Sequence, residues 1–478
     1  MKGKGVRHRI CFQESRGEAT KRKLENPLFE EERSLQITSR KGGVAMLNQN
    51  TQWYKLQYPD CFINEEQRMI QKIVADFVDK EIMPVRHKID DDVTHEEMIE
   101  PILKKLQIGL GWQKAMIPKE YGGNEAMSLV AAALKQEQLS RGDYGISLAS
   151  ACVDWGLAAA TVAYLVAPSP AARAWGKVVL DEFAPKFVGD KLRFACFNMS
   201  EVESACDIEN HLNEARLIRT KAKLSGNEWV INGAKHWASN SGIADLHCLA
   251  CNMDPKSGIE GFTLIYVPEP WEGVSHGKYE VKCGVNADRN TSTYFDNVRV
   301  PKGWGIQGRE AWEIFLNNVV SAFAMNISNC VGMLQGAFDV LLAYTGDRVV
   351  GGKPIREHLS TAMFLGEMVA AISVGRATFL ELCHQFDHPE IYGSWTTDSM
   401  VGKARSSLSL IARMANDLIS RGMEFMGSQG YAREGLYEKY YRDIAVAKLV
   451  LGGVQLGYFS GCRAFYDLDF SSFGPGKL

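Results

Sequence analysis

Residues 230–239 read VINGAKHWAS, and this decapeptide decides how the rest of the chain is interpreted. Asn232-Gly233 indicates a turn, and Trp237 and Ser239 follow it where a strand gives way to a loop. An aromatic ring beside a hydroxyl group at such a place can stack on a planar cofactor and hydrogen-bond to it. A tryptophan after a hairpin is more commonly a packing residue, so the decapeptide alone predicts only a candidate site.

Short alternating segments surround the decapeptide. Apolar and polar residues alternate over 217–222, 228–231, 246–251 and 262–267. Turn signals separate these segments, at 225–227, at Asn232-Gly233 and at 254–258. Alternation with a period of two and a turn every ten residues or so predicts an antiparallel β domain, a small barrel, over residues 191–305.

Helical periodicity dominates on both sides of this β region. Asn64 and Gln67 have the spacing of a capping box, and apolar residues recur at helical spacing from there to Pro84. We therefore expect an N-terminal helical domain over residues 60–190. The helical pattern returns after Pro301 in four long segments, at 309–346, 357–385, 397–426 and 440–465. They predict a four-helix bundle over residues 306–478, and the expected fold class is α+β with helical, β-barrel and bundle domains in that order.

Composition limits the kind of protein. Residues 1–45 are basic with few large apolar residues, but Glu30-Glu31-Glu32 argues against a transit peptide, so we expect a disordered N-terminal extension. The net charge of -3 gives no reason to expect a nucleic-acid partner, and no apolar run looks long enough for a membrane span. Eleven cysteines without a disulfide pattern indicate free thiols, and we expect a cytoplasmic protein. Cys248 and Cys251 lack a second ligand pair for zinc, so we expect them to pack in a strand.

Six short motifs follow one another along the chain. They are PKEYGG at 118–123, Ser200-Glu201 with Asp207, the decapeptide 230–239, FDNVRVP at 295–301, Arg348 with GKPI at 352–355, and GSQGY at 427–431 followed by Arg442-Asp443. In order and spacing they resemble the motifs of the acyl-CoA dehydrogenase family. The resemblance runs from about residue 60 to residue 465.

This resemblance implies a flavoprotein that holds FAD between the β domain and the bundle. Trp237 would lie against the flavin ring, Ser239 near its N5 atom and Ser200 at its pyrimidine end. The diphosphate would be reached from a neighbouring subunit of a dimer or homotetramer, by a guanidinium and the N–H groups of a glycine-rich turn. The cofactor-binding residues implied are Ser200, Trp237, Ser239, Arg348, Gly427, Ser428 and Gly430.

The catalytic base that the resemblance implies is missing. Enzymes of the family use a glutamate to remove the α-proton of a CoA thioester while a hydride leaves the β-carbon for the flavin. One family position of this glutamate corresponds to Leu451 and the other to Ala322. Phe323 and Asn286 stand where the family has arginines, and Phe323 replaces a contact to CoA. The substrate side therefore departs from the family more than the FAD side.

Three interpretations stay open. In the first, the chain is a dehydrogenase of an acyl-CoA thioester whose base has moved, with Asp154 or Asp143 as the base and an electron-transferring flavoprotein as the acceptor. An alicyclic or otherwise unusual acyl group would suit a moved base, although a lone aspartate is more commonly a helix cap or a solvated charge. In the second, the chain is a non-catalytic subunit of a hetero-oligomeric dehydrogenase. In the third, the fold hosts another flavin reaction, that of an oxidase, monooxygenase or desulfinase.

Overall fold

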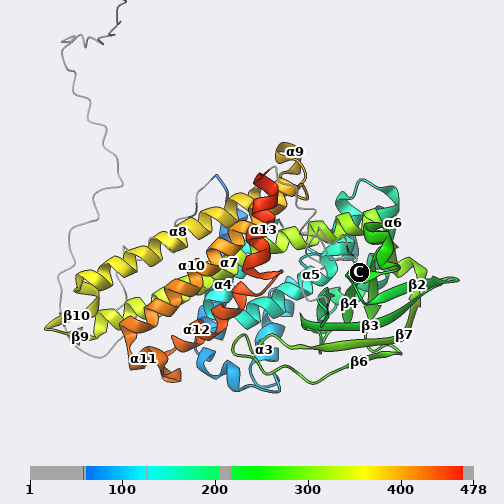
Figure 1. Ribbon diagram of the computed structural model, residues 1–478. Helices are drawn as coiled ribbons and strands as arrows, with labels where there is room; N and C mark the ends of the chain where they lie inside the picture. The colour runs from blue at the N-terminus through cyan, green and yellow to red at the C-terminus, as the bar shows by residue number, and fades with distance from the viewer. Residues whose placement is uncertain (1–57, 59–60, 125–127, 204–214, 216, 467–478) are drawn as a thin grey trace, which may run out of the picture. The chain divides into compact units, whose positions relative to one another are not determined.

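The computed structural model describes residue 58 and residues 61–124, 128–203, 215 and 217–466 (Figure 1). The expected extension at 1–45 and Asp207 lie outside these residues. The described residues follow the expected order, with helices first, a sheet in the middle and a helical bundle last.

The N-terminal part is helical. Asn64 caps its first helix with the predicted capping box, because Asn64 Oδ1 accepts the N–H of Gln67 and Gln67 Oε1 accepts the N–H of Asn64, both at 2.9 Å. The helices of this part are α2 (Glu65–Phe77), α3 (Ile99–Lys104), α4 (Leu129–Gly142), α5 (Tyr144–Val166) and α6 (Pro170–Val188). Shorter helical turns join them, at η2 (Val78–Ile82), η3 (Arg86–Asp91), η4 (Lys105–Gly109), η5 (Trp112–Lys114) and η6 (Lys119–Tyr121).

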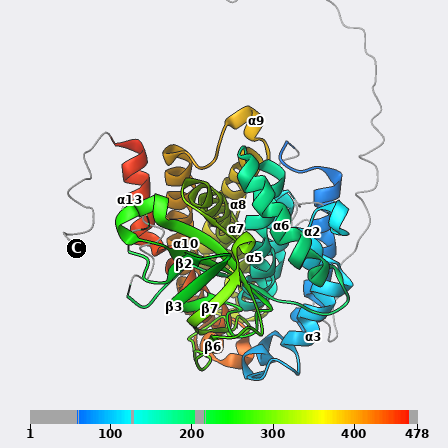
Figure 2. The ribbon, with the colours of Figure 1, turned by 90° about the vertical axis from the view of Figure 1, so that its right-hand side faces the viewer.

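The middle part is an eight-stranded sheet (Figure 2). Its strands are β1 (Ala195–Asn198), β2 (Lys221–Ser225), β3 (Glu228–Ser239), β4 (Leu246–Asn252), β5 (Phe262–Pro268), β6 (Val274–His276), β7 (Asn290–Pro301) and β8 (Gly305–Gln307), with the turns η9 (Pro255–Gly261) and η10 (Lys302–Trp304). The strand order is β6-β7-β3-β2-β4-β5-β8, with β1 also on β4. Most pairs are antiparallel as predicted, whereas β1–β4 and β2–β4 are parallel.

Two local predictions for the sheet were wrong. Strand β2 begins at Lys221 rather than at 217, because the carboxylate of Glu201 accepts the N–H groups of Arg219 and Thr220 at 2.7 and 2.9 Å. Asn232-Gly233 is not a turn but a bulge inside the continuous strand β3. Gly233 has a φ of 146°, and a Cβ there would lie 2.7 Å from the Cα of Thr220.

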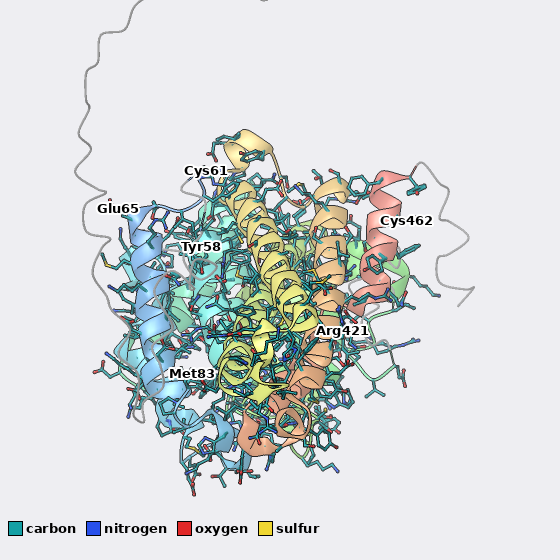
Figure 3. All side chains as sticks on the ribbon, turned by 90° about the vertical axis from the view of Figure 1, so that its left-hand side faces the viewer. Tyr58, Cys61, Glu65, Met83, Arg421 and Cys462 are labelled. Atoms are coloured by element: carbon teal, nitrogen blue, oxygen red, sulfur yellow. The ribbon has the colours of Figure 1, made fainter. Side chains whose placement is uncertain are left out.

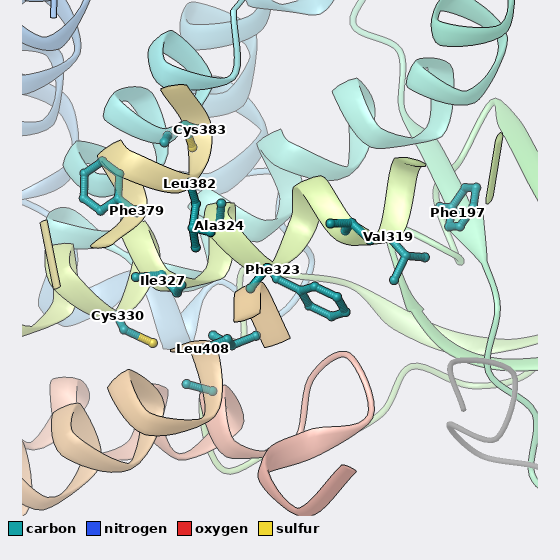
Figure 4. Close-up of a cluster of buried hydrophobic side chains, with 14 of the residues drawn as sticks. Phe197, Val319, Phe323, Ala324, Ile327, Cys330, Phe379, Leu382, Cys383 and Leu408 are labelled. Atoms are coloured by element: carbon teal, nitrogen blue, oxygen red, sulfur yellow. The ribbon is translucent and has the colours of Figure 1, made fainter. Parts of the chain in front are cut away.

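The C-terminal part is a bundle of long helices (Figure 3). It contains α7 (Arg309–Asp347), α8 (Leu359–Asp387), α9 (Pro389–Tyr392), α10 (Asp398–Met426), α11 (Ser428–Tyr431), α12 (Glu438–Ile444) and α13 (Gly453–Phe465), the turns η11 (Ile355–Glu357), η12 (Arg433–Gly435) and η13 (Ala445–Lys448), and the hairpin β9 (Val349–Val350) with β10 (Lys353–Pro354). In its core, Phe323 and Ile327 of α7 belong to one buried cluster with Phe379 of α8 and Leu408 of α10 (Figure 4). The segment predicted as one helix over 440–465 is broken, since Leu451, Gly452 and Gly453 all have positive φ.

Among the described residues, three helices are long and apolar enough to cross a membrane by length and composition alone, namely α5, α7 and α8, contrary to the expectation from the sequence. The bent pair Glu438–Lys448 and Gly453–Phe465 would be a fourth candidate if it counted as one span. The most apolar windows of α5, α7 and α8 are 72%, 78% and 44% buried, respectively. The apolar residues of α5 and α7 therefore pack mainly against the rest of the protein.

A buried cluster of charges joins the three parts of the fold. Lys439 Nζ on α12 lies 2.9 Å from Asp90 Oδ1 of η3, 3.0 Å from Asp143 Oδ2 and 2.9 Å from Asp443 Oδ2. The second carboxylate oxygen of Asp443 also has a partner, since Oδ1 accepts the N–H of Val285 at 2.7 Å. Burial alone would lower the pKa of Lys439, but the three carboxylates outweigh burial and raise it. One lysine thus ties the start of α5 and the segment before β7 to the bundle.

Replacing Lys439 tests how much this cluster contributes to stability. We expect Lys439→Met to lower the free energy of unfolding by about 3–5 kcal/mol, because it leaves buried carboxylates without their counter-ion. Lys403→Met is the control, since Lys403 pairs with Glu381 at 2.7 Å on a partly exposed surface and should cost less than about 1 kcal/mol. Urea unfolding at neutral pH measures both, and equal losses would contradict the assignment.

Candidate functional site

A cavity of about 940 Å³ lies where the three parts of the fold meet. Its walls come from α4, α5, the ends of β1 and β3, the segment 280–290, α7, the loop after α8 and the break before α13. Most of the side chains on these walls are apolar. A cavity of this size, with a few polar groups on an apolar wall, suits a cofactor together with a small-molecule substrate.

Three of the predicted cofactor-binding residues line this cavity, namely Ser200, Trp237 and Ser239. Trp237 is 63% exposed and has a φ of 59°, so the end of β3 presents the indole to the cavity instead of to a core. The amide of Asn290 donates to the carbonyl of Trp237 at 2.9 Å and holds this conformation. Ser239 Oγ donates to Asp288 Oδ2 at 2.6 Å.

A second buried ion pair fixes this wall. Lys235 Nζ donates to Glu201 Oε1 at 2.8 Å and to the carbonyl of Met199 at 2.9 Å. Burial would raise the pKa of Glu201, but Lys235 and the hydrogen bonds from Thr220 outweigh burial and lower that pKa to about 2. The pair locks the end of β1 against β3, and so keeps Ser200 beside Trp237.

Asp288 and Lys282 also line the cavity, and the sequence did not point to them. Asp288 Oδ1 is buried and has no hydrogen-bond partner among the described residues. Lys282 Nζ donates to the backbone carbonyl of Asp288 and to Asn290 Oδ1, and burial lowers the pKa of Lys282. Because both residues stand in an irregular polar loop, neither a motif nor a period marked them.

Asp154, the first candidate for the base, also lies in the cavity wall. Its Oδ2 accepts a hydrogen bond from Lys135 Nζ, whose side chain is fully buried. Its Oδ1 is buried without a hydrogen-bond partner in the described part of the chain. Burial raises the pKa of Asp154, and the ion pair with Lys135 only partly offsets this effect. A carboxylate with a raised pKa and one unpartnered oxygen, in the wall of a largely apolar cavity, has the properties of a general base.

The structure does not bring Asp143, the second candidate for the base, to the cavity. Asp143 caps α5 by accepting the N–H of Ile146 at 2.9 Å, and its other oxygen belongs to the Lys439 cluster. Both oxygens of Asp143 thus take part in structural interactions. The position of Asp143 therefore favours Asp154 as the candidate for the catalytic base.

The two positions at which the family glutamate is absent, Leu451 and Ala322, line the same cavity as Asp154. Leu451 has a φ of 53°, and Arg405 donates to its carbonyl at 3.1 Å. Phe323 is buried in the bundle, with the Arg405 guanidinium 5.1 Å from the centre of its ring. Apolar side chains therefore occupy the places where the resemblance implied a base and a CoA contact.

The other predicted FAD residues lie elsewhere in the chain. Arg348 is exposed at the end of α7 beside the hairpin β9–β10, and Gly427, Ser428 and Gly430 form the junction of α10 and α11. None of these four lines the cavity of its own chain. Figure 1 places both groups at the end of the bundle that is remote from the sheet. A contact of theirs with FAD from a neighbouring subunit stays a prediction.

A helical domain, a central sheet and a helical bundle around one apolar cavity define an oxidoreductase of the acyl-CoA dehydrogenase type. Three family models match the chain. They describe the N-terminal, middle and C-terminal domains of acyl-CoA dehydrogenases, and they match residues 64–167, 196–298 and 312–455, respectively. The chain belongs to the acyl-CoA dehydrogenase family.

Individual relatives agree with this assignment. The chain is 25% identical to cyclohexane-1-carbonyl-CoA dehydrogenase of Syntrophus aciditrophicus over 83% of its own length and 95% of that protein. Its fold is similar to that of butyryl-CoA dehydrogenase from Megasphaera elsdenii, with a TM-score of 0.73, 18% identity, and coverage of 85% and 99% of the two chains. It is also similar to an acyl-CoA dehydrogenase complexed with FAD from Bacillus anthracis, with a TM-score of 0.71, 20% identity, and coverage of 86% and 69%.

The cofactor is FAD, and the residues of the cavity fit it. The exposed face of Trp237 can stack on the isoalloxazine ring. Asp288 and Asn318 line the cavity, and Oδ1 of each is buried without a hydrogen-bond partner among the described residues, so both can serve as acceptors for a ligand.

Glu201→Gln tests the ion pair that fixes the Trp237 wall. Because the pKa of Glu201 is lowered to about 2, its stabilising effect is complete above its ordinary pKa near 4.5 and disappears as the pH falls from there to about 2. We expect the wild-type protein to lose about 3 kcal/mol through this group over that range. In Glu201→Gln this part of the pH dependence should be absent. Urea unfolding at several pH values measures it.

The control is Glu228→Gln, because Glu228 forms an exposed pair with Arg299 at 3.2 Å on the same sheet. An unchanged pH dependence in Glu201→Gln would contradict the role given to Glu201.

Proposed function

We propose that this chain oxidises the Cα–Cβ bond of a CoA thioester and that Asp154 removes the α-proton. The observation that carries the proposal is the free Oδ1 of Asp154 in a buried wall of the cavity that also contains Leu451 and Ala322. A carboxylate is thus present in the same cavity although both family positions of the glutamate are apolar.

The chain's own residues would act as follows. Asp154 Oδ1 takes the proton as the Cα–H bond breaks, and Lys135 stays on Oδ2 and keeps the carboxylate in one orientation. The apolar side chains of Leu451 and Ala322 exclude water from the wall around this step. Ser239, fixed by Asp288, orients the ring of the cofactor. Bound FAD supplies the acceptor of the hydride from the β-carbon.

For the acyl group we propose a compact ring, as in an alicyclic carbonyl-CoA. The volume of the cavity and its apolar walls support a bulky acyl group. The names of two relatives support a ring, because cyclohexane-1-carbonyl-CoA dehydrogenase and the cyclohex-1-ene-1-carbonyl-CoA dehydrogenase of Geobacter metallireducens each match at 25% identity.

The setting of the reaction is proposed on similar grounds. We propose a dimer or tetramer, because Arg348 and the Gly427–Gly430 junction are remote from the cavity of their own chain. The acceptor would be an electron-transferring flavoprotein, as the family resemblance implies. The location would be the cytoplasm, which agrees with nine described cysteines that are all free thiols.

Asp154→Asn tests the base. We expect the purified variant to keep its FAD but to lose about 10²–10⁴-fold in the rate at which an alicyclic carbonyl-CoA bleaches the flavin without oxygen. Asp143→Asn is the control that separates the two candidates, and it should lower stability while the rate per bound FAD stays within a few-fold.

Unchanged bleaching in Asp154→Asn would eliminate Asp154 as the base. A wild-type protein that binds no FAD would favour the non-catalytic subunit. A protein that turns over with oxygen and responds to no thioester would favour another flavin reaction.

Lys135 tests the electrostatics of the base. Removing the ammonium in Lys135→Met raises the pKa of Asp154 further, so the acidic limb of kcat/KM should move to higher pH by about 1–3 units. Lys135→Arg keeps the charge and should leave the limb near its wild-type position. The measurement is the pH profile of kcat/KM, and an unchanged limb in Lys135→Met would show that Asp154 is not the group that titrates.

A further inference from the structure

Two imidazoles and a carboxylate meet in the sheet, on residues that do not line the cavity. They are His247 on β4, Glu269 directly after β5, and His276 on β6. His247 Nε2 lies 2.9 Å from Glu269 Oε2, and His276 Nε2 lies 2.7 Å from the same oxygen. The three ligand atoms therefore converge on one point from three segments of the chain.

The outer nitrogens of both rings have partners too. Asn198 Nδ2 lies 2.9 Å from His247 Nδ1, and Thr293 Oγ1 lies 3.3 Å from His276 Nδ1. Such partners on the second nitrogen fix the orientation of metal-binding histidines. Both rings are thus held so that Nε2 faces the carboxylate.

A further observation at Asn198 points to a ligand. Asn198 is 1% exposed, and its Oδ1 has no hydrogen-bond partner in the described part of the chain. With the amide as placed, its N–H donates to Nδ1, and His247 must carry its proton on Nε2. Turning the amide over brings Oδ1 to Nδ1–H and frees the lone pair of Nε2, and the two orientations have the same shape. In the metal-binding tautomer His247 carries its proton on Nδ1 and needs an acceptor there, and the unpartnered Asn198 Oδ1 can be that acceptor.

We propose that His247, Glu269 and His276 bind a divalent transition-metal ion of the zinc class. Two imidazole nitrogens and one carboxylate oxygen form a donor set that such ions prefer, and solvent can complete the shell. The three ligand atoms lie within 4.8 Å of one another. In a tetrahedral shell with bonds of about 2.0–2.1 Å they would lie about 3.3 Å apart, so small side-chain movements suffice.

The burial of the three residues fits this site. The side chain of His247 is fully buried, whereas Glu269 and His276 keep 17% and 24% of theirs exposed. An ion can enter from that side, and a water molecule can occupy the open position. Without an ion the same groups form hydrogen bonds from two imidazoles to one carboxylate, which is the arrangement that the ion replaces.

The consequence of binding follows from the chain connections. The ion would join β4 to the end of β5 and to β6. Glu269 and His276 stand at the two ends of the connection from β5 to β6, so the ion would also fix this connection. Residues 280–282, which begin four positions after the end of β6, line the cavity. A structural ion here would therefore hold the strand that leads into the wall carrying Lys282.

The test uses the FAD-loaded protein, stripped of metal with a chelator and then titrated with Zn²⁺ in a calorimeter. We expect about one Zn²⁺ per chain in the wild type and less than about a tenth of that in His276→Gln and in Glu269→Gln. His87→Gln is the matched control, because His87 is an exposed histidine on η3, and it should bind as the wild type does.

Two further readouts keep the proposal falsifiable if one variant folds poorly. Co²⁺ should give visible absorption bands outside the flavin spectrum in the wild type but not in His276→Gln. Zn²⁺ should raise the midpoint of thermal unfolding of the wild type but not that of Glu269→Gln. No saturable binding in the wild type, or equal binding by His276→Gln and the wild type, would overturn the proposal.

Discussion

The buried ammonium of Lys439 is the interaction on which the arrangement of the site depends. It faces carboxylates from η3, from the start of α5 and from α12. One of them, Asp443, also accepts a hydrogen bond from the backbone N–H of Val285 and so holds that backbone in place. Val285 precedes Asp288 by three residues, so the loop that carries Asp288 is fixed to the bundle and not only to the sheet. The wall that faces the cofactor is therefore positioned by a charge cluster that does not itself line the cavity.

Two other buried lysines show how environment separates the roles of two carboxylates. Glu201 accepts hydrogen bonds from Lys235 and from two backbone N–H groups, and its pKa falls to about 2. Asp154 has Lys135 on one oxygen and no described partner on the other, and its pKa is raised. The first carboxylate is saturated and can only hold strands together, whereas the second can still accept a proton.

The helices and the cavity residues of β3 were predictable from the sequence because they depend on local period and on motif order. The expected helix over 309–346 corresponds to Arg309–Asp347, since a buried 39-residue helix repeats its apolar face many times. The start of β2 was not predictable, because the carboxylate of Glu201 replaces ladder bonds from a distance of nearly twenty residues. The place of Asp288 depends on the Asp443–Val285 contact, which joins residues 158 positions apart, and no sequence period reports such a contact.

The absent glutamate and the buried aspartate belong to one feature of the cavity. Five carboxylate residues line its walls, and they are Asp154, Glu280, Asp288, Asp387 and Glu390. Among the described residues, Asp154 and Asp288 each leave one buried oxygen without a partner. A glutamate at Leu451 or Ala322 would add a further carboxylate to the same cavity. Neighbouring like charges disfavour one another's ionised forms, so a further carboxylate close to Asp154 would make the ionised form of Asp154 less stable. Apolar residues at both family positions are therefore compatible with the base that we propose at Asp154, because neither of them adds a competing carboxylate.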